Sequence, residues 1–179
     1  RRGPAQIRQP AQGQRAGEIL AVADVGAHQL ARGGEIPGQQ QRRDAVVLGM
    51  GGSSLAPEVL RCAFGGREGW PALHVLDTTD PATIRAVVGH IDPARTLFFV
   101  SSKSGTTIEA LSLFAYFYGL VRAAKGGSAG ENFVAVTDAG TPLQDLAREC
   151  GFRHVFTNPS DIGGRYSALS YFGMAPAAV

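Results

Sequence analysis

The stretch AVVLGMGGSSLAPEV, residues 45–59, decides the fold. It opens with a short apolar run at 45–48, continues through a turn of glycines and serines at 49–54, and enters a helical segment that Pro57 helps to start. A run of four apolar residues is too short for a helix and fits a buried strand. Glycines let the backbone of the turn approach a ligand closely, and free amides at a helix start favour an anion. The stretch therefore predicts a strand, a ligand-binding turn and a helix.

The same alternation repeats along the chain. Each apolar run is rich in Val, Leu or Phe, and helical patterns separate one run from the next. The five runs are residues 45–48, 73–76, 96–100, 133–136 and 154–156. We therefore predict an α/β fold, with a doubly wound, mainly parallel five-stranded sheet flanked by helices and with ligands at the carboxyl ends of the strands.

Several residues mark where the helices begin and end. Asp80 before Pro81 predicts a capped helix start, and Gly151 predicts a left-handed helix stop. Two capping boxes are predicted, one pairing Thr106 with Glu109 and the other Thr141 with Gln144. The helix predicted at 108–121 is apolar on nearly every face, so either another domain or subunit covers it, or it is tightly wedged in the core.

The composition favours one compact domain and excludes several function classes. The chain has 179 residues, 44% of them hydrophobic, and a formal net charge of +2, which argues against a nucleic-acid-binding protein. The longest apolar run, residues 108–121, contains Glu109 and Ser112 and is shorter than the roughly 20 residues of a membrane span. Cys62 and Cys150 match no metal-ligand spacing, so we expect two buried free thiols in a cytoplasmic protein and no bound metal.

Residues 1–44 differ from the rest of the chain. They hold eight of the nine glutamines and no aromatic residue. Such a segment buries too little apolar surface to offset its ordering entropy, so we expect it to be disordered apart from a weak helix at 17–31. Scattered arginines without aromatic neighbours make a basic arm for nucleic acid the weaker interpretation. The folded domain is expected over residues 45–179.

A second turn carries the densest chemistry. Residues 101–107, SSKSGTT, follow a predicted strand, open a helix, and bring together five hydroxyls and the ammonium of Lys103. Hydroxyls, an ammonium and unpaired amides are donors that phosphate oxygens require. The alternative is a serine-rich turn without a ligand. The similar turn at 49–54 makes that alternative less favoured. No lysine follows the glycines of that first turn, which excludes a Walker loop, and the match to a dinucleotide fingerprint is weak.

A third turn follows the last predicted strand. Residues 161–167, DIGGRYS, place two glycines beside Arg165. The permanent cation of Arg165 can stabilise a developing oxyanion. Taken alone, a solvent-facing arginine in a tight turn is the better interpretation, but the position of this turn relative to the other two favours a shared site.

At these three turns the sequence resembles the phosphoglucose isomerase family, in its first sugar-isomerase (SIS) domain. The matching segments are GMGGSSLAP at 49–57, SSKSGTTIEA at 101–110 and DIGGRYSALS at 161–170. The likeness covers roughly residues 45–179. Together with HVLDTTDPATI at 74–84, the last segment is most similar to the isomerase half of bifunctional transaldolase/phosphoglucose isomerase proteins, although residues 1–44 contain no recognisable transaldolase portion.

The resemblance implies a flavodoxin-like SIS fold and a site for a sugar 6-phosphate substrate. It implies interconversion of glucose 6-phosphate and fructose 6-phosphate through an enediolate, in glycolysis and gluconeogenesis, without a metal or organic cofactor. In the family pattern Arg165 assists at the enediolate stage. The residues that would bind the substrate are Gly52, Ser53, Ser102, Lys103, Ser104, Gly105, Thr106 and Thr107. Ser54 and Ala110 depart from residues that are common in relatives.

The resemblance also implies that this chain is a fragment. The glutamate base of the family lies in a second SIS domain, a ring-opening histidine comes from the partner subunit of a homodimer, and a lysine near the C-terminus completes the site. None of these groups can be assigned here, so we expect a phosphate-binding half-site that is inactive alone. The alternatives are a non-catalytic, regulatory sugar-phosphate-binding module of SIS type and, less favoured, a nicotinamide-dependent dehydrogenase. We expect no nucleic-acid or membrane partner.

Overall fold

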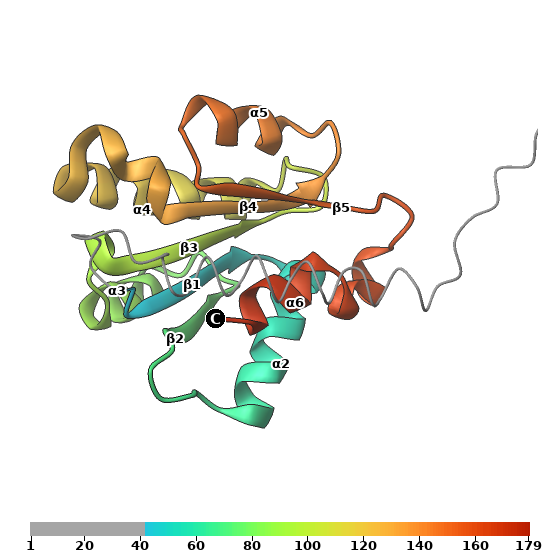
Figure 1. Ribbon diagram of the computed structural model, residues 1–179, viewed down its shortest axis with the longest axis horizontal. Helices are drawn as coiled ribbons and strands as arrows, with labels where there is room; N and C mark the ends of the chain where they lie inside the picture. Colours follow the sequence, from blue (N-terminus) through green and yellow to red (C-terminus); the bar gives the residue numbers. More distant parts are fainter. Residues whose placement is uncertain (1–41) are drawn as a thin grey trace, which may run out of the picture.

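The computed structural model describes residues 42–179 (Figure 1). The helix predicted at 17–31, and most of the predicted disordered segment 1–44, lie outside the described residues. In the described part of the chain, five parallel strands form one sheet in the order β2-β1-β3-β4-β5. The strands are β1 (Asp44–Gly49), β2 (Ala72–Leu76), β3 (Thr96–Ser101), β4 (Phe133–Asp138) and β5 (His154–Asn158). This is the flavodoxin-like strand order, and all five predicted strands are confirmed.

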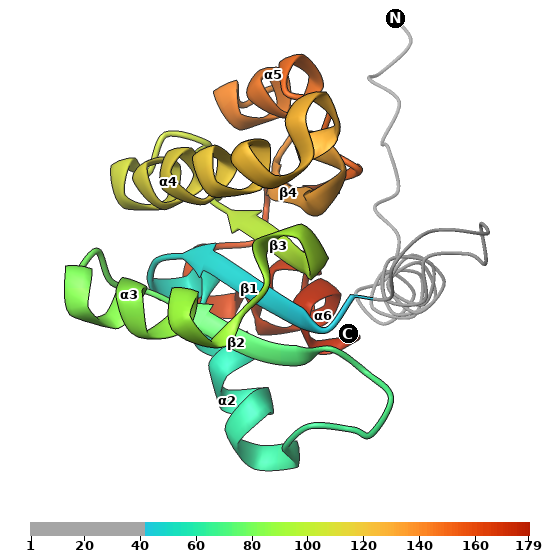
Figure 2. The same cartoon turned by 90° about the vertical axis from the view of Figure 1, so that its left-hand side faces the viewer.

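Helices cover both faces of the sheet. The α-helices are α2 (Leu55–Phe64), α3 (Pro81–His90), α4 (Ile108–Lys125), α5 (Pro142–Glu149) and α6 (Tyr171–Ala177). The short 3-10 helices are η1 (Gly51–Ser53), η2 (Pro93–Arg95), η3 (Gly126–Asn132) and η4 (Gly164–Leu169). Figures 1 and 2 show α3, α4 and α5 on one side of the sheet and α2 and α6 on the other. No helix in residues 42–179 is long and apolar enough to cross a membrane.

The central strand β3 shows why the apolar runs are continuous. All six of its residues are buried, because alternate side chains enter two different cores. Phe98 packs with the helices α3, α4 and α5, whereas Phe99 packs with Phe172 of α6. The doubly wound sheet therefore needs hydrophobic side chains at consecutive positions of a central strand, here residues 97–100, and a periodicity of two would not identify it.

The structure shows how much of the apolar helix α4 is covered by the core of this domain. Its inner face, including Leu113, Phe117 and Val121, is fully buried in the core above β1 and β3. On other faces Tyr116 remains 44% exposed and Ile108 remains 72% exposed. The helix is thus a core helix on its sheet side, while its exposed apolar side chains have no cover within residues 42–179.

The predicted helix ends are confirmed in two cases. The Asp80 carboxylate accepts a hydrogen bond from the backbone N–H of Thr83 at 2.8 Å, as a helix N-cap does. Gly151 has φ +66°, and the N–H of Phe152 donates to the carbonyl of Ala147 at 2.8 Å, which is a Schellman helix end.

The two predicted capping boxes are wrong in their details. The N-cap of α4 is Thr107, and the hydroxyl of Thr106 is hydrogen bonded to Ser104 instead. Gln144 accepts from the backbone N–H of Gly140, one residue before the N-cap Thr141. In both turns the hydroxyl that was expected to cap the helix is drawn into a hydrogen bond with another hydroxyl of the same loop region.

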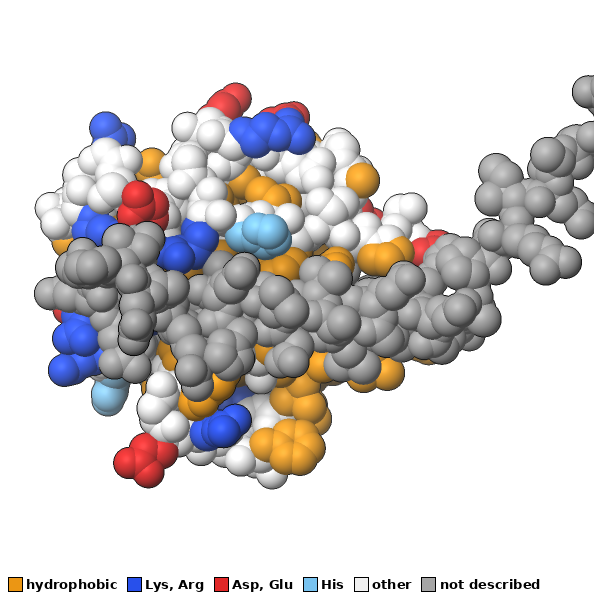
Figure 3. Space-filling view, viewed as in Figure 1, with side chains coloured by type: hydrophobic (Ala, Val, Ile, Leu, Met, Phe, Trp, Pro, Cys, Tyr) orange, Lys and Arg blue, Asp and Glu red, His pale blue; other side chains and the backbone are white. Residues whose placement is uncertain are grey.

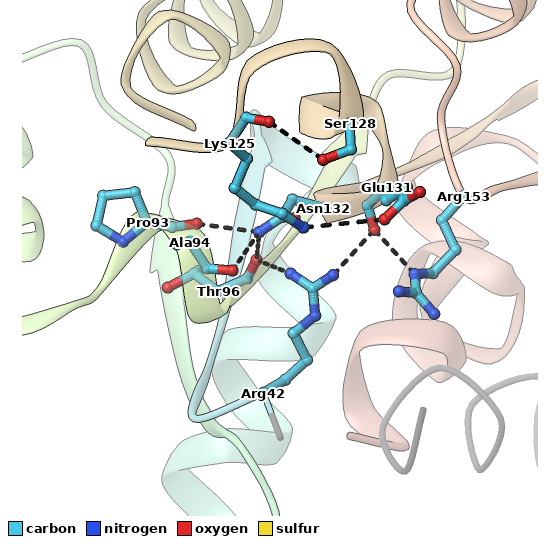
Figure 4. Close-up of polar contacts among 9 residues, drawn as sticks. All are labelled: Arg42, Pro93, Ala94, Thr96, Lys125, Ser128, Glu131, Asn132 and Arg153. Atoms are coloured by element: carbon cyan, nitrogen blue, oxygen red, sulfur yellow. Dashed lines mark hydrogen bonds and ion pairs between the residues drawn. The ribbon is translucent and has the colours of Figure 1, made fainter. Parts of the chain in front are cut away.

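At the amino ends of the strands, a polar network ties the start of the domain to the end of α4 (Figure 4). The guanidinium of Arg42 donates to the carbonyls of Thr96 and Glu131 at 2.9 and 3.2 Å, and Arg153 donates to the same Glu131 carbonyl at 2.8 Å. Burial, with a further contribution from the nearby cation of Arg153, lowers the pKa of Arg42 to about 10. Residues 42–44 therefore belong to the folded domain, although the sequence placed them in the disordered segment.

Asn132 is the centre of that network and is fully buried. Its amide donates to the carbonyls of Pro93, Ala94 and Thr96, and its oxygen accepts from the Lys125 ammonium at 2.7 Å. Burial lowers the pKa of Lys125, and the positive charge of Arg42 acts in the same direction. A buried amide that satisfies several carbonyls fixes the turn between η2 and β3.

Candidate functional site

A cavity of about 580 Å³ lies where the strands end. In Figure 1 this edge of the sheet faces right, toward the turns that lead into η1, α4 and η4. Four turns line the cavity, one after each of β1, β3, β4 and β5. The lining residues are Met50, Gly52, Ser53, Lys103, Ser104, Thr107, Asp138, Ala139, Thr141, Ser160 and Gly164. Because parallel strands end at one edge, segments far apart in the sequence meet there.

The first and last turns touch through their backbones. A side chain on Gly52 would place its Cβ only 2.2 Å from the carbonyl oxygen of Gly164, so only glycine permits this approach. The hydroxyl of Ser167 lies within hydrogen-bond distance of the carbonyls of both glycines, at 3.0 Å from Gly52 and 2.6 Å from Gly164, and its one proton is shared between them. This contact fixes Ser53, the next residue along the chain, in the cavity wall.

The turn after β3 is organised from within by Ser102. Its hydroxyl oxygen accepts the backbone N–H groups of Gly105 and Thr107, at 3.1 and 3.5 Å, and shares a hydrogen bond with the Thr107 hydroxyl at 2.9 Å. Gly105 has φ +69°, and a Cβ there would lie 2.7 Å from the side chain of Thr141. Both residues therefore shape the turn while Ser104 and Thr107 face the cavity.

The N-terminus of α4 opens at this cavity. Thr107 is both the N-cap of this 18-residue helix and a lining residue, and its side chain makes no capping hydrogen bond to the helix. The first amides of a helix lack partners within the helix and carry partial positive charge. An uncapped start of a long helix at a cavity lined by hydroxyls is suited to an anion, and to phosphate oxygens in particular.

One ion pair lies in the cavity wall. The ammonium of Lys103 makes a close contact with Asp138 Oδ2 and donates to the carbonyl of Ser160 at 3.3 Å. The other carboxylate oxygen, Asp138 Oδ1, is buried and has no hydrogen-bond partner among the described residues. Lys103 is the only cationic side chain among the described side chains that line the cavity.

The structure brings most of the predicted site residues together. Ser53 and Ser104, from turns far apart in the chain, line the same cavity. The predicted residues that line it are Gly52, Ser53, Lys103, Ser104 and Thr107. Ser102, Gly105 and Thr106 lie in the same turn but outside the lining set, and Ser102 and Gly105 are buried. Arg165 belongs to η4, directly after the lining residue Gly164, and its side chain is not described.

Sequence reasoning missed the turn after β4. Asp138 lines the cavity from the last position of β4, Ala139 and Thr141 line it from the turn that follows, and Ser160 lines it from the segment after β5. One signal was present in the sequence, because Asp138 is an acidic residue two positions after the strand predicted at 133–136. Its significance depends on the strand order, which places β4 next to β3 and brings Asp138 to Lys103.

The donor set in this cavity suits an anion better than a metal ion. Hard cations require several carboxylate or carbonyl oxygens, and zinc requires thiolates or imidazoles. Within residues 42–179 there is no group of three or more His, Cys, Asp or Glu residues that could hold a metal ion. The cavity instead presents hydroxyls, an ammonium and a helix N-terminus.

The fold and the cavity define the class of this protein as a flavodoxin-like α/β domain with a hydroxyl-lined cavity at the carboxyl edge of its sheet. Sequence comparison identifies the family. The family model described as Phosphoglucose isomerase matches residues 27–179, and the chain belongs to the phosphoglucose isomerase family.

Individual relatives agree with this assignment. The chain is 38% identical over 136 residues to a glucose-6-phosphate isomerase from Thermus thermophilus, and the matched region is 75% of this chain and 32% of that protein. It is 35% identical over 144 residues to a glucose-6-phosphate isomerase from Carboxydothermus hydrogenoformans, with 75% and 31% covered. The chain therefore spans about a third of the length of the curated relatives that it matches.

Solved structures support the same fold. A crystal structure of a glucose-6-phosphate isomerase from Chlamydia trachomatis superposes with a TM-score of 0.74 and 30% identity, over 96% of this chain and 32% of that chain. A hypothetical protein from Thermus thermophilus superposes with a TM-score of 0.70 and 32% identity, over 92% and 44% of the two chains. The five-stranded parallel sheet and its helices thus match a known glucose-6-phosphate isomerase structure.

Proposed function

We propose that this chain forms the phosphate-binding part of a glucose-6-phosphate isomerase, which interconverts glucose 6-phosphate and fructose 6-phosphate in glycolysis and gluconeogenesis. The observation that carries the proposal is the cavity at the uncapped N-terminus of α4, lined by the hydroxyls of Ser53, Ser104 and Thr107 and by Lys103. These donors match the oxygen shell of a phosphate group. The family and the names of the relatives supply the identity of the sugar.

The proposed site has two kinds of residue. Ser53, Lys103, Ser104 and Thr107 line the cavity and would contact the phosphate. The residues that would hold those four in place are Gly52, Ser102, Gly105 and Thr106. Their contacts, described above, are made within and between the turns.

Arg165 follows the cavity residue Gly164 and is proposed to act in catalysis. Moving a proton between C2 and C1 of the sugar passes through an enediolate, whose negative charge a guanidinium can stabilise. The base that removes the proton is not among the residues we can assign. Catalysis is therefore proposed to need further polypeptide, a second SIS domain and a partner subunit in a homodimer.

Exposed apolar side chains are consistent with such further contacts. On α2, Leu55, Val59 and Phe64 are 64%, 55% and 80% exposed. Figure 3 shows hydrophobic side chains gathered in the lower part of the molecule, where α2 lies. Apolar side chains that cluster at a surface favour contact with another protein surface. A cytoplasmic location fits the free thiols of Cys62 and Cys150, although Cys62 is exposed and Cys150 only partly buried, so the predicted burial of both is wrong. The particular similarity to bifunctional transaldolase/phosphoglucose isomerase proteins stays a prediction.

Calorimetric titration of the chain with fructose 6-phosphate tests the site. Replacing Ser104 and Thr107 together by alanine should weaken binding at least about tenfold, because hydrogen bonds to a charged group contribute about 1.5–3 kcal/mol each. Ser128→Ala, an exposed serine at the opposite edge of the sheet, is the matched control and should bind normally. Unchanged affinity in the double variant would refute the phosphate assignment, and binding of NAD without fructose 6-phosphate would favour a dehydrogenase. Binding that never supports turnover, even with the remaining polypeptide present, would indicate a regulatory module.

A further inference from the structure

Lys103 connects three of the four turns around the cavity. It belongs to the turn after β3, its ammonium contacts the carboxylate of Asp138 at the end of β4, and it donates to the carbonyl of Ser160 after β5 at 3.3 Å. The backbone at the end of β4 is also joined to the turn after β3, because the N–H of Asp138 donates to the carbonyl of Lys103 at 3.3 Å. The lysine is therefore held at both ends of its side chain.

This arrangement leaves one direction for the remaining donor of the ammonium. A lysine ammonium has three N–H donors, and Asp138 and Ser160 account for two of them. A free lysine side chain loses rotamer entropy when it binds a ligand. An ammonium that is already fixed between two acceptors has lost much of that freedom, so its third N–H is pre-organised for a ligand in the cavity.

The carboxylate is suited to hold the ammonium tightly. The side chain of Asp138 is only 14% exposed, and its Oδ1 is buried without a hydrogen-bond partner among the described residues. A carboxylate that has lost most of its water depends on its ion pair for stabilisation. Asp138 thus restrains Lys103, although its negative charge also opposes an incoming anion.

We propose that Asp138 is a positioning residue for phosphate binding, which acts by holding the Lys103 ammonium at the cavity wall with one N–H directed to the anion. The inference rests on the proposed function, because it concerns the same cavity. Restraint of Lys103 by Asp138 raises the affinity for the anion more than repulsion by the carboxylate lowers it. Asp138→Ala should therefore weaken the binding of fructose 6-phosphate and of inorganic phosphate about tenfold or more.

A double-mutant cycle in the 179-residue chain separates positioning from a general structural role. Dissociation constants for both ligands are measured by calorimetry in the wild type, Asp138→Ala, Lys103→Met and the double variant. If Asp138 acts through Lys103, its replacement no longer weakens binding once Lys103 is methionine, and the loss of its negative charge leaves the affinity unchanged or raises it. Asp145→Asn is the control for net charge, because this carboxylate is exposed on α5 and outside the cavity; it should bind as the wild type does.

Each outcome decides one of the two proposals. Wild-type or tighter binding by Asp138→Ala overturns the positioning role, and so does an equal loss of affinity in the Lys103→Met background. If the alanine variant does not fold, Asp138→Asn replaces it in the same cycle, with a smaller loss expected because the amide oxygen still accepts from the ammonium. If the wild type binds neither ligand, the proposed function itself fails.

Discussion

Gly52→Ala tests the backbone contact that closes the site. The new Cβ would lie 2.2 Å from the carbonyl oxygen of Gly164 and 2.8 Å from its carbonyl carbon. These are backbone atoms that cannot rotate away, so one turn must move by roughly 1 Å or more to restore ordinary contact. Overpacking of this kind costs about 1–3 kcal/mol, which corresponds to a fall of about 2–12 °C in Tm for a domain of this size.

The same displacement should impair the cavity. Ser53 follows Gly52 directly, so its hydroxyl moves with the turn, and we expect fructose 6-phosphate to bind at least about tenfold more weakly, since hydrogen bonds weaken steeply with distance and angle. Thermal unfolding followed by circular dichroism gives the stability, and calorimetric titration gives the affinity.

Gly164→Ala is the matched control for this prediction. It changes the other partner of the same contact, but its Cβ would meet no atom within 4 Å. We expect a change in stability within about 0.5 kcal/mol, as for an ordinary surface substitution. If both variants have the same Tm and affinity as the wild type, the close approach of the two turns, and the reasoning built on it, is refuted.

Two further substitutions test contacts outside the site. Asp80→Ala should destabilise the chain at pH 7. Hydrogen bonds from Thr83 hold the pKa of Asp80 below its ordinary 3.8. The Asp80 carboxylate therefore stabilises the folded chain above pH 3.8, and this contribution is lost as the pH falls below that value. A gap between variant and wild type in urea unfolding that stays constant from pH 7 to pH 3 would contradict this. Asn132→Ala should cost about 2–3 kcal/mol, because several buried carbonyls lose their donor. Its control, the exposed Ser128→Ala, should change little, and equal urea midpoints for the two variants would refute the role of the buried amide.

The strands and the three glycine and hydroxyl turns could be predicted from the sequence because their signals are local. A buried strand such as residues 96–101 needs a continuous apolar run, and a tight turn such as that at Gly105 needs a residue that accepts positive φ. The same local signals predicted that Ser53 and Ser104 would meet, since both follow strands of one parallel sheet. The conformation of these strands and turns depends on neighbouring residues in the chain, so the tertiary structure did not change it.

The capping boxes could not be predicted reliably, because hydroxyls have several partners within reach. Thr106 pairs with Ser104, and Thr141 pairs with Thr137, so neither is left to cap its helix through the side chain. The cover of α4 was equally undetermined by its sequence. The sequence of an apolar helix does not indicate which neighbouring element buries each face. In the structure, the face of α4 that carries Phe117 is buried, and the face that carries Tyr116 is exposed.

The sequence alone determined the strand and helix alternation, the turns that carry donors, and the family to which the chain belongs. Only the tertiary structure decided that Asp138 and Ser160 join the cavity wall beside Lys103. Asp138 and Ser160 reach Lys103 across 35 and 57 residues of chain, and this happens because β4 and β5 follow β3 in the order of the sheet. Local sequence fixes backbone conformation through short-range sterics and burial, whereas the partner of a charge depends on which strand ends lie side by side.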